Sequence, residues 1–162
     1  MKMKKILAVL MAVLMIAVCF AGCGEDKELT QYKEQMESFF SEVEAVHNAM
    51  NAIDPESETA LEELFTCLDD LDSLFLTMAE IEVPEEFSNI EKLADEASEN
   101  MSLAVENYHN AYSADSYNEY TASTADKYYS RANKRLHYII DILHGEIPDG
   151  EDIVITEEES LE

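Results

Sequence analysis

Glutamate and histidine recur in this chain at a spacing that can hold metal ions. Glu44 stands three residues before His47, and Glu106 stands three residues before His109; four-helix bundles use this Glu-x-x-His spacing to ligate paired iron or manganese. On a helical projection, however, Glu106 points about 140° away from Met101, the centre of its own apolar stripe. The chain has 25 glutamates, so the motif arises readily by chance. We therefore predict no metal site and no bound cofactor.

Other catalytic signatures are missing from the sequence. It contains no Cys-x-x-Cys-His haem attachment sequence, no glycine-rich phosphate loop and no nucleophile elbow. Its many acidic residues could supply a hydrolytic pair, but such a pair needs a concave site that perturbs the carboxylates. We predict no catalytic residues, and an envelope enzyme is the least favoured function.

Tyrosines and cations gather in the second half of the chain. Tyr108, Tyr112, Tyr117 and Tyr120 form a cluster that could be an aromatic platform for a sugar or a partner. We favour a simpler interpretation, in which these rings plug one end of a helical bundle and their hydroxyls reach water.

Four cations lie close together further along the chain. Lys127, Arg131, Lys134 and Arg135 fall on one side of a helix, the first three within about 60° of one another. They could form an anion site, for example for wall-polymer phosphates. We favour a counter-charge face that pairs with acidic neighbouring helices.

The elements that must position these residues are four amphipathic helices. Apolar residues follow steps of three and four, the pattern of one helix face, in four stripes that are separated near Pro55, Pro84 and Ser116. The short linkers make successive helices antiparallel neighbours. We predict an all-α, up-down-up-down four-helix bundle over residues 27–145, with Gly145 as its stop. The acidic tail, residues 146–162, is expected to be disordered or to lie extended along the bundle.

The second helix carries an additional apolar line. Ala60, Cys67, Leu74 and Ile81 are spaced by seven residues, about 100° from Leu68 at the centre of the core stripe. Either this helix is wedged between both of its neighbours, or the tail covers it. A third interpretation makes Cys67, Leu74 and Ile81 a seam for a protein partner or for self-association.

Charge limits the possible partners. All 36 acidic residues follow Cys23, whereas Lys2, Lys4 and Lys5 precede it, so the part from Cys23 onward has a formal charge of −29. Such a charge repels nucleic-acid phosphates and anionic lipid head groups. We predict no binding to nucleic acid.

The amino terminus has the layout of a secretory signal. Basic residues precede an apolar run over residues 6–20, and Ala21 and Gly22 then lead to Cys23. Phe20-Ala21-Gly22-Cys23 resembles the lipobox of bacterial lipoproteins, in which Leu is usual where this chain has Phe20. The resemblance implies a signal peptide over residues 1–22 that is cut before Cys23, and diacylglycerol linked to the Cys23 sulfur. The alternatives are an uncleaved anchor and an ordinary signal followed by a stray cysteine.

These features predict a lipid-anchored helical protein on the extracytoplasmic face of a bacterial cell membrane. Residues 23–28 would be its lipidated tether, and the bundle would be a non-catalytic module for a protein partner or for self-association. A ligand- or metal-binding bundle that serves uptake or sensing is the alternative.

Overall fold

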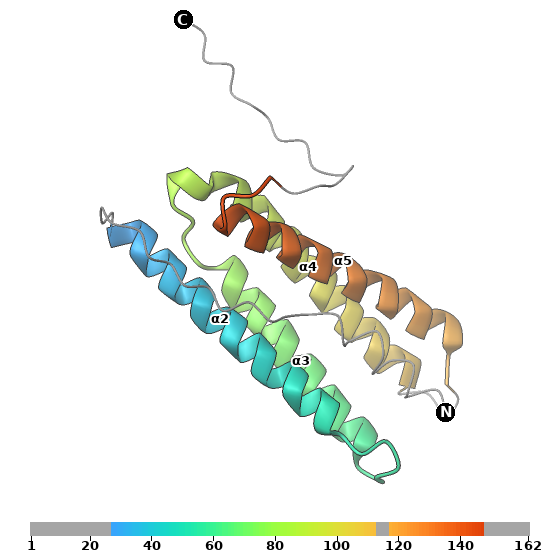
Figure 1. Cartoon of the computed structure of the whole chain (residues 1–162). Coiled ribbons are helices and arrows are strands. Elements are labelled where there is room, and N and C mark those ends of the chain that lie inside the picture. Colours follow the sequence, from blue (N-terminus) through green and yellow to red (C-terminus); the bar gives the residue numbers. More distant parts are fainter. Residues whose placement is uncertain (1–26, 113–116, 148–162) are drawn as a thin grey trace, which may run out of the picture.

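The computed structural model describes residues 27–112 and 117–147, which are almost entirely helical. In chain order the elements are α2 (Lys27–Ala52), α3 (Ala60–Ala79), the short 3-10 helix η2 (Glu85–Phe87), α4 (Ser88–Tyr112) and α5 (Glu119–Leu143). Successive long helices run in opposite directions (Figure 1). The predicted all-α four-helix bundle is therefore confirmed, and no strand occurs in the part of the chain that the structure describes.

Several predicted segments lie outside the described residues. These are the signal peptide over residues 1–22, Cys23 with residues 24–26 of the tether, and residues 148–162 of the tail. Lys27 and Glu28, which the sequence assigned to the tether, already belong to the first turn of α2. Within the described residues, 27–112 and 117–147, no helix is both long enough and apolar enough to cross a membrane.

The end of α5 follows the prediction at Gly145. The φ angle of Gly145 is +74°, a left-handed conformation that glycine adopts without a steric penalty. Its N–H donates to the carbonyl of Ile142 at 2.9 Å, and the N–H of Glu146 donates to the carbonyl of Asp141 at 2.8 Å. These two bonds form a Schellman motif, which satisfies the last carbonyls of the helix.

Local polar side chains shape the turns that precede α3 and α5. Asp54 stands directly before Pro55, where the first and second stripes separate; its Oδ1 accepts a hydrogen bond from the Glu56 N–H within a turn, and α3 begins only at Ala60. Before α5 the N-cap is Asn118, whose side chain accepts from the Thr121 N–H at 3.1 Å. Asx turns and N-caps use the same side-chain acceptor, so the sequence alone does not separate them.

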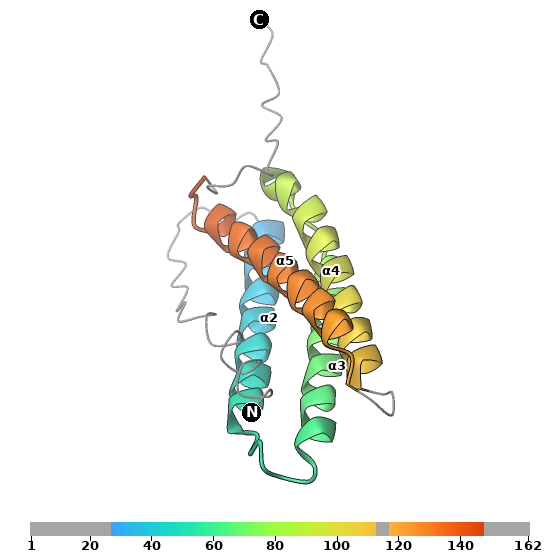
Figure 2. The ribbon, with the colours of Figure 1, turned by 90° about the vertical axis from the view of Figure 1, so that its right-hand side faces the viewer.

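The two helical hairpins of the bundle are packed with side chains of different size. The α2–α3 pair buries large groups, such as Phe39 and Phe75, whose ring centroids lie 5.6 Å apart and nearly perpendicular. In contrast, α4 and α5 approach each other most closely of all the helix pairs; Figure 2 shows the end of α4 beside the start of α5. The buried alanines of these two helices are Ala94, Ala97, Ala104, Ala111, Ala122, Ala125 and Ala132. Because methyl groups take little room, the two backbones can lie close together.

The four predicted stripes supply nearly all of the core. On α5 every predicted stripe position from Ala122 to Leu143 is buried. On α2 the stripe residues Tyr32, Met36, Phe39, Val43 and Met50 are buried, whereas Val46 is only partly buried. The core therefore runs the length of the bundle, and the acidic residues are left on its outer faces.

Candidate functional site

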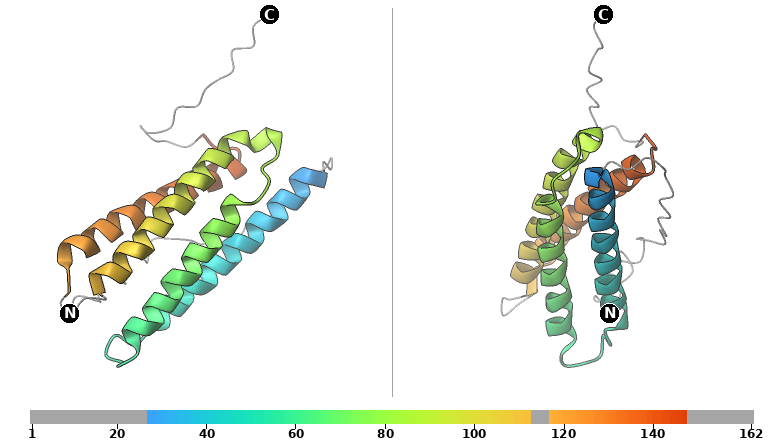
Figure 3. Two further views of the ribbon diagram at one scale, coloured as in Figure 1. Left: turned by 180° about the vertical axis from the view of Figure 1, so that it is seen from behind. Right: turned by 90° about the vertical axis from the view of Figure 1, so that its left-hand side faces the viewer.

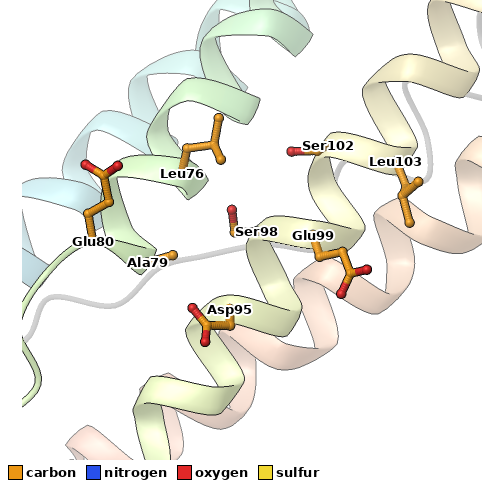
Figure 4. A pocket seen from close by; sticks show the side chains of 8 residues that line it. All are labelled: Leu76, Ala79, Glu80, Asp95, Ser98, Glu99, Ser102 and Leu103. Carbon is orange, nitrogen blue, oxygen red and sulfur yellow. The ribbon is translucent and has the colours of Figure 1, made fainter.

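The candidate site is a groove between α3 and α4. It has a volume of about 640 Å³ and is open to solvent. Residues from both helices line it (Figure 4). They are Leu76, Ala79, Glu80, Asp95, Ser98, Glu99, Ser102 and Leu103.

Small side chains create the groove. Ala79 ends α3, and Ser98 and Ser102 stand one turn apart on the side of α4 that faces it. None of the three fills the space that a leucine or phenylalanine fills elsewhere between these helices. Figure 3 shows from behind that α3 and α4 run alongside each other, and the residues that line the groove come from α4 and from the second half of α3 with its C-cap.

The groove has an exposed apolar wall on α3. Leu76 is 49% exposed, although it belongs to a helix whose other large apolar residues are buried or half-buried. At 100° per residue it points about 140° away from Leu71, the centre of the buried face of α3. Leu76 therefore lies outside the core and offers its side chain to the groove.

Two serines of α4 differ in how their hydroxyls are satisfied. Ser102 donates to Asp72 Oδ1 across the groove at 2.5 Å. Ser98 is only 5% exposed as a residue, but it lines the open groove, and its hydroxyl is not among the buried polar atoms that lack a partner in the described residues. Figure 4 shows the oxygens of both serines directed into the space between the helices. The Ser98 hydroxyl is therefore open to the groove and available to a ligand.

Negative charge surrounds the groove without local neutralisation. Glu80, Asp95 and Glu99 are exposed along its rim. The sequence has no lysine or arginine between Lys33 and Lys92, so α3 carries none. The single lysine of α4, Lys92, lies 3.8 Å from Glu96; at 100° per residue it points about 120° away from Ser98.

The predicted seam on α3 is not exposed. Cys67 is buried, and Leu74 and Ile81 are half-buried against the core. By helical projection Cys67 and Leu74 lie on the opposite side of Leu71 from Leu76, so they face away from the groove. Ile81 follows the end of α3 at Ala79. The simpler interpretation, in which α3 is wedged between neighbouring helices, matches this arrangement. Burial, followed by the charges of Asp70 and Glu63, raises the pKa of the Cys67 thiol, which makes it unreactive.

The predicted basic face lies along the outer side of α5. Arg135 Nε donates to Glu96 Oε2 of α4 at 2.5 Å, which supports the counter-charge interpretation for this residue. Arg131 lies over the Tyr128 ring, and Lys134 lies over the Tyr138 ring, each 5.6 Å from the centroid. Lys127 is exposed. Whether this face also binds an anion stays untested.

The two Glu-x-x-His motifs are not brought together. His47 is buried, and its Nε2 lies 2.9 Å from the Tyr129 hydroxyl of α5, whereas His109 bonds to Asp69 of α3 at 2.7 Å. Glu44 and Glu106 are exposed on their own helices. Residues 27–112 and 117–147 contain no group of three or more histidine, cysteine, aspartate or glutamate side chains that could hold a metal ion.

The tyrosine cluster is mostly a stack of rings at the end of α4. Tyr112 packs on Tyr117, with 5.1 Å between ring centroids, and on Phe65 of α3. Tyr108 is buried and donates to Asp126 Oδ1 at 2.7 Å. Tyr120 alone is strongly exposed, at 81%. The arrangement fits the predicted plug of rings, because a platform would need several exposed rings side by side. The expectation that the ring hydroxyls reach water is wrong for Tyr108 and Tyr112, which are packed into the bundle end.

Sequence reasoning missed the groove. Its signal was present only as small residues beside the apolar stripes, at Ala79 and Ser98, and as Leu76 away from its stripe. No protein-family model matches the chain, and comparisons with curated proteins and with solved structures give no match.

Proposed function

We propose that this chain is a lipid-anchored, non-catalytic binding module that holds a protein partner at the extracytoplasmic face of a bacterial cell membrane. The observation that carries the proposal is the order of residues 1–23: three lysines, an unbroken apolar run, Ala21-Gly22 and then Cys23. This order is that of a secretory signal that ends at an acylated cysteine. Two acyl chains on one cysteine are enough for stable anchoring.

The position of α2 supports a bundle held close to the membrane. α2 begins at Lys27, and the four residue-to-residue steps from Cys23 to Lys27 can reach at most about 14 Å. The high negative charge that follows Cys23 would be repelled by anionic head groups. The bundle would therefore stand on its tether without lying flat on the bilayer.

The contacts at the start of α2 orient the groove relative to the tether. Tyr32 packs against Phe87 of η2, with 6.0 Å between ring centroids, and the Lys33 ammonium lies 5.7 Å from the centre of the same ring. Since η2 directly precedes α4, the end of the groove at Glu80 lies at the tethered end of the bundle. A partner in the groove would then be held near the membrane surface.

Acylation is tested by growing the source cells with an alkyne-bearing palmitate. The wild-type chain should incorporate the label, and Cys23→Ala should remain an unlabelled, uncut precursor. Cys67→Ala is the matched control, because this buried cysteine should not affect labelling. A labelled Cys23→Ala product would contradict the lipobox interpretation.

Partner binding is tested by cross-linking in the same cells, followed by mass spectrometry of what is recovered. The proposal expects a protein that is cross-linked to the wild-type chain and to Cys67→Ala, and that is lost with Cys23→Ala. Equal recovery with all three chains would contradict a function that depends on the anchor. A tightly bound small molecule in place of a protein would favour the alternative of a ligand-binding bundle.

A further inference from the structure

The α3–α4 groove combines an apolar wall with an acidic rim. Leu76 is half exposed on one side, and Glu80, Asp95 and Glu99 stand along the edges. An apolar ligand would leave these carboxylates without partners, and a simple cation would leave Leu76 in water. A ligand that matches both features presents an apolar side chain between positive charges.

The open shape of the groove limits the size of that ligand. Sites for small molecules enclose most of the ligand surface, whereas here the three rim carboxylates and Leu76 all remain exposed to solvent. A small molecule would therefore gain little burial. A longer segment that lies along the groove can contact Leu76 and several carboxylates at once.

The spacing of the acidic groups favours a helical segment. Asp95 and Glu99 are one turn apart on α4, about 6 Å along the helix axis. Cations at positions i and i+4 of a partner helix have the same spacing. Amphipathic helices commonly bind in grooves between helices, with apolar residues at i, i+3 or i+4 as anchors.

Ser98 offers the ligand a polar contact at the floor of the groove. Its hydroxyl is directed into the groove between α3 and α4. The neighbouring Ser102 is already bonded to Asp72. A lysine ammonium placed between Asp95 and Ser98 could donate hydrogen bonds to both oxygens.

We propose that the α3–α4 groove binds a cationic amphipathic helix of the partner protein, with an apolar side chain against Leu76 and lysine or arginine side chains against Asp95, Glu99 and Glu80. This inference rests on the proposed function as a protein-binding module. The same groove disfavours a nucleic acid or an anionic lipid surface, since both would meet its carboxylates.

The test uses the full chain in a non-ionic detergent and a fluorescent 14-residue peptide of leucine and lysine. Its leucines stand at positions 1, 4, 5, 8, 11 and 12. A second peptide carries glutamate in place of lysine, and a third contains lysine alone. Fluorescence anisotropy should show that the leucine–lysine peptide binds about tenfold or more tightly than either control, since charge and apolar contact both contribute. Equal binding by the lysine-only peptide would overturn the inference in favour of a diffuse polyanion effect.

Matched variants locate the binding. Glu80→Gln, Asp95→Asn and Glu99→Gln together should weaken binding about tenfold or more, because they remove the charges that face the cations. The same change of charge on exposed positions of α2, made by Glu34→Gln, Glu37→Gln and Glu44→Gln, should change it by less than about threefold. Equal losses in the two triple variants would overturn the groove as the site.

Two single substitutions test the floor of the groove. Ser98→Leu should fill the groove and reduce peptide binding, whereas Ser98→Ala should weaken binding only severalfold and leave the melting temperature nearly unchanged, because it removes one hydroxyl that is open to the groove. Unaltered binding by Ser98→Leu, with circular dichroism showing an intact bundle, would overturn the inference. The chain could also form dimers without any peptide. If the triple variant of Glu80, Asp95 and Glu99 abolishes such dimers, a second copy of this chain occupies the groove, and the inference is overturned.

The outcome is distinguishable from failure of the proposed function. If the peptide binds to the groove but Cys23 is not acylated, the lipid anchor is refuted and the inference about the groove stands. If Cys23 is acylated but peptide binding does not depend on the groove, only the inference about the groove is refuted.

Discussion

Replacing Tyr129 by phenylalanine removes a single hydroxyl from the core, with a calculable effect. The hydroxyl lies 2.9 Å from His47 Nε2, and the two residues are 3% and 6% exposed. Burial lowers the pKa of His47, opposed by a hydrogen bond with the Val43 backbone, so His47 is neutral at pH 7. Because the Val43 carbonyl can only accept, the ring proton belongs on Nδ1 and Nε2 accepts from Tyr129. Burial also raises the pKa of Tyr129 to about 12, and the Asn133 side chain partly offsets it, so Tyr129 keeps its proton.

The expected cost follows from this geometry. In Tyr129→Phe the buried Nε2 atom loses the hydrogen-bond donor that the described part of the chain gives it, and an unsatisfied buried polar atom costs about 1–3 kcal/mol. For a domain of this length each kcal/mol corresponds to roughly 3–5 °C in melting temperature. We therefore expect thermal unfolding, followed by circular dichroism at pH 7.5, to shift downward by about 3–15 °C.

The bundle offers a matched control for the same chemical change. The Tyr138 hydroxyl is buried and has no hydrogen-bond partner among the described residues. Tyr138→Phe should therefore leave the melting temperature unchanged or raise it, because it removes an unsatisfied group. If Tyr129→Phe is as harmless as Tyr138→Phe, the buried bond between α2 and α5 does not exist as described. In the double variant His47→Leu with Tyr129→Phe, the loss should be smaller than the sum of the single losses.

Three further predictions concern the same bundle. The lowered pKa of His47 means that the unfolded state binds a proton more readily, so the free energy of unfolding should fall as the pH drops below about 6.5; His47→Leu should flatten this fall in urea titrations from pH 5 to 8. Arg135→Gln should lower stability by about 1 kcal/mol or less through loss of the Glu96 contact, and by less still in high salt. Ala125→Leu should cost about 1–3 kcal/mol by overpacking the α4–α5 contact, measured by urea unfolding.

Controls for these three changes come from exposed positions. His137→Gln should keep the pH dependence, Lys127→Gln should leave stability nearly unchanged, and Ala45→Leu on the outer face of α2 should cost little. If the free energy of unfolding of His47→Leu depends on pH as it does in the wild type, another titratable group causes the dependence. If Arg135→Gln and Lys127→Gln lower stability equally, the effect comes from the overall charge of the protein and not from the contact of Arg135 with Glu96. If Ala125→Leu does not lower stability, α4 and α5 can move apart freely.

The spacing of apolar residues was sufficient to predict the bundle, because the buried face of each helix is specified within a single segment of the chain. The alternating steps that end at Leu143 specify which face of α5 is buried, and Gly145 marks the end of that helix by its own conformational freedom. The starting points of α3 and α5 were less predictable, because Asp54 and Asn118 are both suitable caps and neighbouring turns decide which is used.

The candidate site was less predictable because it depends on how two helices are rotated against each other. The apolar residues at the end of α3 extend nearly all round the helix, and the sequence does not say which of them the neighbours cover. The structure turns Leu74 and Ile81 toward the core and leaves Leu76 exposed. Likewise, the bond between His47 and Tyr129 links residues 82 positions apart, so it depends on the register of α2 against α5.

The contact of Tyr32 with Phe87 also has a mechanical consequence for a tethered chain. It places the start of α2 and the Glu80 end of the groove at the same end of the bundle. If Cys23 is held in a bilayer and a partner pulls on the groove, the load separates two neighbouring ends of the antiparallel helices α2 and α3. Such a load opens the hairpin from that end, so contacts between the two helices, such as Phe39 with Phe75, break one after another. A pull on the opposite end, at the turn before Ala60, would instead act along the helix axes and load these contacts together. We therefore expect the anchored bundle to resist a pull at the Glu80 end less strongly than a pull at the other end, because the rate of forced unfolding follows the barrier along the direction of the pull.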